Sequence, residues 1–191
     1  MGNDWIFRSL GASNHVDFER EFADYYATDP AAVKKLLEKE KFSDVILEPA
    51  CGGGHISKAL EEEGYTVISQ DLYDHGYGTS GIDFLSEGKK PGMDIITNPP
   101  YKFALDFVKH SLDVIDEGRK VAMFLKIQFL ESEKRYKLFE KYPPAKVYVF
   151  VKRQKIATGG KFKESNSNSV CYAWFLWIKG HDEPPIIEWI L

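Results

Sequence analysis

The sequence predicts an α/β fold built on one doubly wound, mostly parallel sheet. Three observations support this class. The chain has 191 residues, of which 43% are hydrophobic and 28% charged, as expected for one globular domain. Short apolar strands alternate with helical patterns through the first two thirds of the chain, which is typical of βαβ units and a parallel sheet. The last third is rich in β-branched and aromatic residues and lacks a comparable helical pattern.

The alternating part begins at Asp29-Pro30, because Asp caps helix N-termini and Pro suits the first helical position. Helices are predicted where apolar side chains recur at helical spacing, over residues 30–41, 55–63 and 101–117. Strands are predicted where short apolar runs are bounded by turns, at residues 44–48, 66–70, 93–97 and 120–127. Gly64 and Gly118 mark the ends of the last two helices.

Two further strands are predicted near the C-terminus, at residues 146–151 and 170–178. The 18 residues between them show no helix pattern, so the two strands are expected to pair antiparallel and to close the sheet with an antiparallel edge. Residues 29–191 are therefore predicted to form a single domain, preceded by an N-terminal segment, residues 1–28. The apolar tail 184–191 is expected either to close the core or to dock on a neighbour such as another subunit.

Several classes are excluded by composition. Cys51 and Cys171 are too few for a disulfide framework and are expected to be reduced thiols. The five histidines show no metal-ligand spacing with either cysteine, so no metal site is predicted. No apolar run reaches the roughly 18 residues of a membrane helix, and the N-terminus lacks a signal-peptide pattern. A cytoplasmic protein without a membrane partner is expected.

A basic stretch precedes the last predicted strand. Residues 146–163 contain six Lys or Arg side chains and no acid. Two interpretations remain open from composition alone: a solvated strand and loop, or phosphate contacts beside a catalytic cleft.

A glycine-rich turn, Glu48-Pro-Ala-Cys-Gly-Gly-Gly54, joins a predicted strand to a predicted helix. Glycines allow the backbone to approach a ligand, and a helix N-terminus offers unpaired N–H groups. Position 57 is Ser where a dinucleotide fingerprint has its third glycine, and the Gly-Lys-Ser/Thr of a P-loop is absent. The acid at Glu48 favours a ligand that carries an ammonium group over a pyrophosphate.

Two more acids follow at the ends of later segments. Asp71 ends the next strand, where a carboxylate is expected to accept ribose hydroxyls. Asp83, followed by Phe84, suits an adenine amino group and ring. Each acid alone is more often a surface residue, but three in this order indicate a ligand with an amine, a ribose and an adenine.

The sequence Asn98-Pro99-Pro100-Tyr101 follows the strand 93–97. The prolines remove two backbone donors and force the chain out of strand geometry, which leaves the Asn98 side-chain oxygen and the Pro99 carbonyl as directed acceptors. Two such acceptors bind both protons of a planar –NH2 group and aim its lone pair at an electrophile, while Tyr101 stacks on the attached ring. The alternative is a structural Asn-Pro turn that begins a helix.

Together, EPACGGG, the acid in QDLYD, GIDFL and NPPY resemble, in order and spacing, class I S-adenosylmethionine-dependent methyltransferases. NPPY resembles their amino-methyltransferase branch, chiefly enzymes that methylate N6 of adenine in DNA. DYYATDP resembles the cofactor-contacting segment of that branch, in the gamma order, and LGASNH…DYYATDP…NPPYK…FLE resembles small phage and prophage members. The resemblance covers about residues 11–178 and implies a Rossmann-like, seven-stranded sheet with an antiparallel last strand.

The resemblance also implies roles for individual residues. The implied catalytic residues are Asn98, Pro99, Pro100 and Tyr101. The implied cofactor-binding residues are Tyr26, Thr28, Pro30, Glu48, Pro49, Ala50, Cys51, Gly52, Gly54, Asp71, Leu72, Asp83, Phe84 and Asn98. The implied substrate-binding residues are Tyr101, Lys102, Arg153, Lys161, Phe162 and Lys163.

The implied reaction is methyl transfer from S-adenosyl-L-methionine to N6 of adenine in DNA, with the flipped base stacked on Tyr101. The same chemistry on RNA or on a protein glutamine amide remains an alternative, as does a non-catalytic cofactor- or nucleic-acid-binding module. Such enzymes often carry a separate target-recognition domain, for which this chain has no segment of sufficient size. Specificity is therefore expected to be short, loose, or supplied by a partner or a homodimer.

Overall fold

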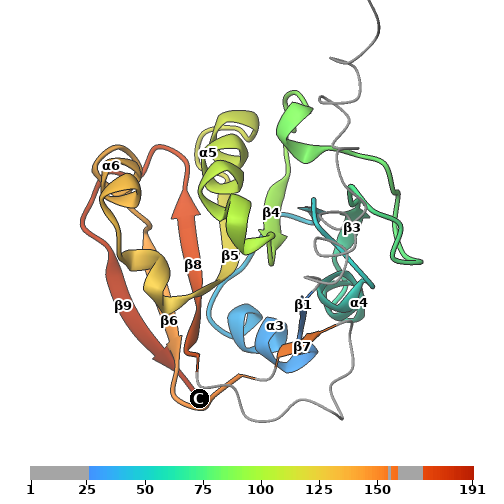
Figure 1. Cartoon of the computed structure of the whole chain (residues 1–191), viewed down its shortest axis with the longest axis horizontal. Helices are drawn as coiled ribbons and strands as arrows, with labels where there is room; N and C mark the ends of the chain where they lie inside the picture. The colour runs from blue at the N-terminus through green and yellow to red at the C-terminus, as the bar shows by residue number, and fades with distance from the viewer. Residues whose placement is uncertain (1–25, 155, 159–169) are drawn as a thin grey trace, which may run out of the picture.

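The computed structural model describes residues 26–154, 156–158 and 170–191. Within them a seven-stranded mixed sheet has the strand order β3-β2-β4-β5-β8-β6-β9, with helices on both faces (Figure 1). The strands are β2 Val45–Glu48, β3 Thr66–Ser69, β4 Asp94–Thr97, β5 Lys120–Lys126, β6 Lys146–Phe150, β8 Tyr172–Ile178 and β9 Ile186–Ile190. The helices are α3 Pro30–Leu37, α4 His55–Glu62, α5 Ala104–Val114 and α6 Glu133–Lys141. The predicted doubly wound α/β class is confirmed.

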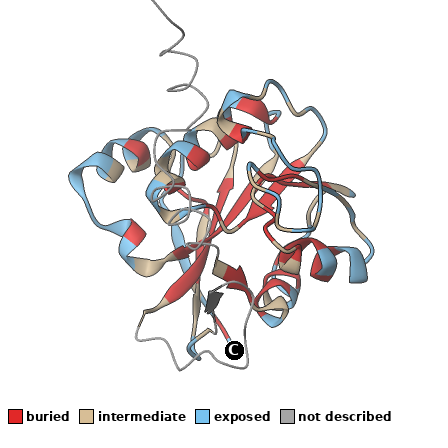
Figure 2. Cartoon of the chain, turned by 45° about the vertical axis from the view of Figure 1, so that its right-hand side comes forward, coloured by how far each residue is buried: buried red, intermediate tan, exposed pale blue. Residues whose placement is uncertain are grey.

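The two faces of the sheet carry separate cores. Helices α3 and α4 bury Leu36 and Leu60 against one face, and α5 and α6 bury Val108 and Leu138 against the other. Figure 2 shows the buried residues gathered on the sheet and on the inner sides of the helices. Strand β4 is buried at all four residues, as expected of a parallel strand covered by helices on both sides.

The parallel half of the sheet matches the sequence prediction. Strand β2 pairs in parallel with β3 and β4, and β4 pairs in parallel with β5. All four strands therefore end at the same edge of the sheet, which is the edge where ligands bind in open α/β folds. None of the helices within the described residues is long and apolar enough to cross a membrane.

The C-terminal strands differ in position from the prediction. Strand β8 pairs antiparallel with β6, as predicted, but also with β5, so it lies inside the sheet and not at its edge. Its sequence explains this place, because Trp174 belongs to one core and Trp177 to the other, and a strand buried on both faces needs a neighbour on each side. The edge is β9, which pairs in parallel with β6. The apolar tail thus closes the core through Ile190, which is 2% exposed.

Besides β9, strands β1 Tyr26–Thr28 and β7 Ile156–Thr158 and helix α6 were not predicted. Strands β1 and β7 form a separate antiparallel pair, with β7 in the segment predicted as loop. Helix α6 buries a single side chain, Leu138, and so lacks the apolar periodicity that marks a helix in a sequence. The predicted helix at 101–117 is split, because the one-turn 3-10 helix η2 Tyr101–Phe103 precedes α5.

Candidate active site

The first two predicted site segments meet at the carboxyl edge of the sheet. The Cys51 N–H donates to the Gln70 carbonyl at 3.0 Å, and the Gly52 N–H donates to Asp71 Oδ2 at 2.8 Å. The glycine-rich turn after β2 is therefore fixed directly on the residues that follow β3. Strand β4, paired with β2, delivers Asn98 to the same edge.

The Asn98 amide is held in one orientation. Its Nδ2 donates to the Tyr26 carbonyl of β1 at 2.8 Å. Because a carbonyl only accepts, this bond directs Oδ1 to the other side, where it is buried and has no hydrogen-bond partner among the described residues. A buried acceptor without a donor costs about 1–3 kcal/mol, so this oxygen is suited to a ligand N–H group.

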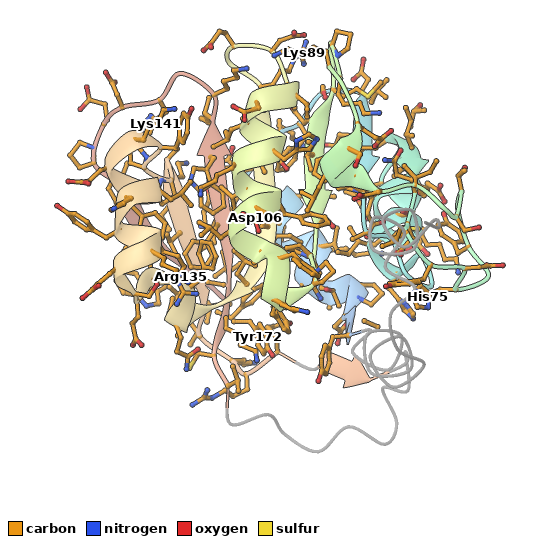
Figure 3. The ribbon with its side chains drawn as sticks, turned by 45° about the horizontal axis from the view of Figure 1, so that its top comes forward. His75, Lys89, Asp106, Arg135, Lys141 and Tyr172 are labelled. Atoms are coloured by element: carbon orange, nitrogen blue, oxygen red, sulfur yellow. The ribbon has the colours of Figure 1, made fainter. Side chains whose placement is uncertain are left out.

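Tyr101 lies in a cluster of aromatic rings beside Asn98. Its ring centre is 5.7 Å from that of Tyr26 and 6.1 Å from that of Tyr172, which begins β8. Figure 3 shows Tyr172 at the end of the sheet near β1 and β7. The Lys126 ammonium lies 4.6 Å from the Tyr101 ring centre, a cation–π contact that the sequence did not suggest. Burial raises the pKa of the Tyr101 phenol far above its ordinary value, so the ring stays neutral.

Glu48 ends β2 as a buried acid, 1% exposed. Its carboxylate accepts a hydrogen bond from the Ser57 hydroxyl of α4, and Ser57 lies 2.6 Å from the Ser69 hydroxyl of β3. Burial raises the pKa of Glu48 well above its ordinary value, and the negative charge of Asp71 acts in the same direction. A ligand ammonium beside this carboxyl group would reverse that shift, because an opposite charge favours the ionised form.

The carboxylate of Asp71 already organises the backbone. Oδ2 accepts the Gly52 N–H and Oδ1 accepts the Tyr73 N–H, at 2.8 and 2.9 Å. A carboxylate offers about four acceptor positions, so capacity for two hydroxyl groups remains. The neighbouring Leu72 is 49% exposed, an unusual exposure for a leucine beside a buried acid, and it offers an apolar contact at this edge.

Asp83 and Phe84 both make contacts within the protein, in addition to the adenine contacts predicted for them. The Asp83 carboxylate accepts the Leu85 N–H at 3.1 Å and the Ser86 hydroxyl at 2.9 Å, and so caps the short 3-10 helix η1 Phe84–Ser86. Phe84 is 2% exposed and packs on Phe107 of α5, with ring centres 5.2 Å apart. Their contact with an adenine remains a prediction.

The other predicted cofactor residues lie around the same turn. Burial raises the pKa of the Cys51 thiol to about 12, which suits a packing residue and not a nucleophile. Pro49 is buried and Ala50 is half-buried. Thr28 of β1 is 2% exposed, and its hydroxyl has no partner within the described part of the chain. Pro30 begins α3 behind its cap Asp29.

Of the predicted substrate residues, Lys102 is exposed beside Phe103 of η2. Arg153 follows β6 at the same edge and donates to the Cys171 sulfur at 2.7 Å. Lys161, Phe162 and Lys163 lie outside the described residues.

Tyr77 covers the glycine-rich turn and was missed in the sequence. A Cβ atom added to Gly54 would lie 2.3 to 2.5 Å from three atoms of the Tyr77 ring. The ring is held by its hydroxyl, which donates to Glu61 at 3.1 Å, and by the Lys58 ammonium 4.6 Å above it. The chain between β3 and η1 thus returns over α4, which no local pattern in the sequence indicates.

The substitution Gly54→Ala is expected to destabilise the protein more than Gly76→Ala. Both glycines have φ +77°, so both variants incur left-handed backbone strain of about 1–2 kcal/mol. Only Gly54→Ala also displaces Tyr77, which adds about 1–3 kcal/mol, because a Cβ at Gly76 meets nothing within 4 Å. Urea denaturation measures the difference, and equal losses of unfolding free energy would show that Tyr77 does not pack on the turn.

The fold, but not a family assignment, follows from comparison with known proteins. No protein-family model matches the chain, and none of the curated proteins matches it. A predicted O-methyltransferase from Agrobacterium tumefaciens superposes with a TM-score of 0.60 at 12% identity, over 85% of this chain and 86% of that one. The 23S rRNA methyltransferase ErmE superposes with a TM-score of 0.54 at 15% identity, over 84% and 71%.

The M protein of the type I restriction enzyme EcoKI also matches, with a TM-score of 0.54 at 17% identity. The match covers 83% of this chain but 44% of that protein, so this chain spans less than half of its length. These similarities and the strand order define the class: the chain has the Rossmann-like fold of class I S-adenosylmethionine-dependent methyltransferases.

Proposed function

We propose that this protein transfers a methyl group from S-adenosylmethionine to an exocyclic amine, N6 of adenine in DNA. The observation that carries the proposal is the Asn98 amide, whose Nδ2 is bound to the Tyr26 carbonyl while its buried Oδ1 lacks a partner among the described residues. A structural Asn-Pro turn has no use for a buried acceptor left without a donor. An acceptor of an –NH2 proton has such a use.

The residues at the glycine-rich turn fit S-adenosylmethionine. Glu48 is an acid whose pKa burial raises well above its ordinary value, and an ammonium group beside it would favour its ionised form. Gly52 allows a ligand to approach the backbone, Asp71 has acceptor capacity for the ribose hydroxyls, and Leu72 offers apolar area for the adenine. When bound, the cofactor supplies an electrophilic methyl group on a sulfonium centre.

The chain itself supplies position rather than acid–base chemistry. Asn98 Oδ1 and the Pro99 carbonyl accept the two protons of the target amine, which frees its lone pair for in-line attack on the methyl carbon. Tyr101 provides a flat neutral surface for the ring that carries the amine. With the cofactor bound, the new N–C bond would form as the methyl–sulfur bond breaks, and Asn98 Oδ1 and the Pro99 carbonyl would hold the excess amine proton until it leaves to water.

Nucleic acid is the acceptor class that the surroundings support. ErmE is named as a 23S rRNA methyltransferase, and the EcoKI M protein is named as part of a type I restriction enzyme. Arg153 and Lys102 lie at the carboxyl edge as candidate phosphate contacts. The gamma order and the likeness to small phage and prophage enzymes favour DNA, with any further specificity supplied by a partner or a second copy.

The acceptor class is tested by incubating the protein with tritiated S-adenosylmethionine and, in parallel, unmethylated DNA, total RNA and a protein lysate. Label in DNA is expected. Label in RNA or protein instead would retain the Asn98 chemistry and overturn the DNA proposal. Bound cofactor with no label in any acceptor would favour a non-catalytic binding module.

A further inference from the structure

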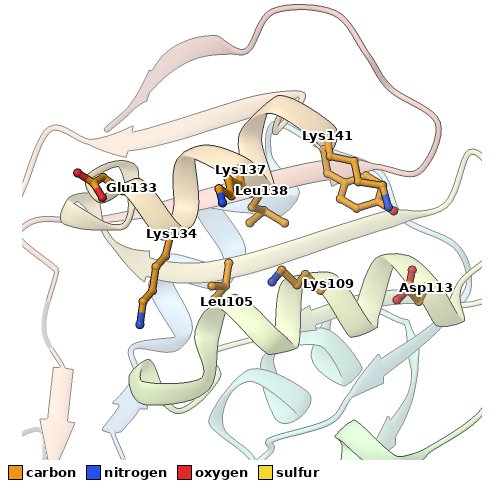
Figure 4. A pocket seen from close by; sticks show the side chains of 9 residues that line it. Leu105, Lys109, Asp113, Glu133, Lys134, Lys137, Leu138 and Lys141 are labelled. Atoms are coloured by element: carbon orange, nitrogen blue, oxygen red, sulfur yellow. The ribbon is translucent and has the colours of Figure 1, made fainter.

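A groove of about 570 Å³ runs between α5 and α6, on the face of the sheet opposite α3 and α4. Figure 4 shows side chains entering it from both helices. The charged residues that line it are four lysines and two acids: Lys109, Lys134, Lys137, Lys141, Asp113 and Glu133. The groove is therefore basic in a chain whose net charge is −4.

The side chains of three of these lysines have no partner among the described residues. The ammonium groups of Lys109, Lys134 and Lys137 make no hydrogen bond or salt bridge there, although Asp113 and Glu133 line the same groove. Some lysines outside the groove do have close carboxylate partners: the pairs include Lys34–Glu62 at 3.1 Å, Lys120–Glu40 at 2.6 Å and Lys146–Glu40 at 3.0 Å. Neighbouring unpaired cations repel one another, and an anion in the groove removes that repulsion.

One end of the groove lies close to the candidate active site along the chain. Helix α5 follows Tyr101 after one turn of η2, so Leu105, at one end of the groove, lies four residues from Tyr101. Helices α5 and α6 follow β4 and β5, so both begin at the carboxyl edge. In Figure 3, Arg135 near the start of α6 lies toward Tyr172, while Lys141 lies at the far end.

The length of the groove distinguishes a polymer from a single phosphate. The 11 residues of α5 span about 16 Å at about 1.5 Å per residue, which is long enough for more than one phosphate of a DNA strand. Lys134, Lys137 and Lys141 are spaced along α6 and so do not converge on one point. This arrangement matches a track of phosphates.

We infer that the α5–α6 groove binds the sugar-phosphate backbone of duplex DNA next to the target base. The inference rests on the proposed function and adds a second contact surface to it. It assigns a nucleic-acid contact to residues outside the basic stretch 146–163. The groove positions the duplex, and Asn98 and Tyr101 act on the flipped base.

The test compares two triple variants with the same change in net charge. One is Lys109→Gln, Lys134→Gln and Lys137→Gln; the control is Lys35→Gln, Lys39→Gln and Lys41→Gln, at and after α3 on the opposite face. Fluorescence anisotropy measures binding of a labelled duplex of roughly 30 base pairs over about 50–200 mM salt. The groove variant is expected to bind at least about ten-fold more weakly, with a salt slope smaller by about 2–3, since each phosphate contact contributes about 0.9.

The control is expected to bind like the wild-type protein. Equal affinity and equal slope for the two variants would overturn the inference, even if the wild-type protein methylates DNA. A reduced slope in the groove variant, with no methyl transfer by the wild-type protein, would support the groove and contradict the proposed function. Failure of the wild-type protein to bind duplex DNA, or binding to RNA alone, would also overturn the inference.

Discussion

The variant Asn98→Ala is expected to transfer methyl groups about 10²–10³-fold more slowly than the wild-type protein, the range found when one preorganised transition-state contact is removed. The reason is that Oδ1 is a buried acceptor that has no hydrogen-bond partner among the described residues and so can accept from the target amine. Single-turnover transfer from tritiated S-adenosylmethionine measures the effect. Cofactor affinity and thermal stability are expected to remain close to wild type.

A second variant distinguishes the role of the Asn98 side-chain oxygen from that of the hydrogen bond that orients it. Asn98→Asp keeps a side-chain oxygen for the amine but loses the Nδ2 donor to the Tyr26 carbonyl. Its rate is expected to fall between those of wild type and Asn98→Ala. A wild-type rate in Asn98→Ala would remove Asn98 from the chemistry and leave only the structural turn.

The variant Glu48→Gln is expected to bind S-adenosylmethionine about 10–100-fold more weakly. The amide keeps the shape and can keep the Ser57 hydrogen bond, but it cannot carry the charge that pairs with the ligand ammonium, and a hydrogen bond between charged groups is worth about 1.5–3 kcal/mol. Titration calorimetry measures the affinity. Asp106→Asn serves as the control and is expected to bind like the wild-type protein, because Asp106 is an exposed acid of α5 outside the predicted cofactor residues.

The raised pKa of Glu48 predicts that the stability of the protein depends on pH. Burial raises the pKa of Glu48 in the folded protein, so the folded state holds this proton more tightly than the unfolded chain does. The stability that follows is present below the ordinary pKa of about 4.5 and is lost as pH rises toward the folded pKa, at no more than about 1.4 kcal/mol per pH unit. Urea denaturation between about pH 5 and pH 8 should show this loss in the wild type and a smaller one in Glu48→Gln. Parallel curves would contradict the raised pKa.

The parallel half of the fold could be predicted because its signals are local. Each strand from β2 to β5 is a short apolar run, and glycines such as Gly64 and Gly118 punctuate the helices. The remaining elements depend on distant partners. Strand β7 is three residues long and exists by pairing with β1, with Tyr26 opposite Thr158. The central position of β8 follows from the burial of both its faces. The sequence prediction considered only its pairing with the strand at residues 146–151, so it placed β8 at the edge.

The predicted site segments follow the same division. Glu48, Asp71 and Asn98 were found because they stand at strand ends, and parallel strands bring these ends together. Tyr77 and Lys126 were missed because they reach the site through a returning chain segment and a cation–π contact. The basic side of the groove could be predicted from the spacing of Lys134, Lys137 and Lys141, but only if residues 133–141 are first assigned to a helix.

Methyl transfer to an exocyclic amine is tested most directly by identifying the atom that receives the methyl group. DNA labelled by the protein with tritiated S-adenosylmethionine would be digested to nucleosides and the products separated. We expect label in N6-methyladenine, because in the proposed mechanism Asn98 and Pro99 accept both protons of a planar exocyclic amine. Label on a ring carbon, on an oxygen, or on no nucleoside at all would contradict it.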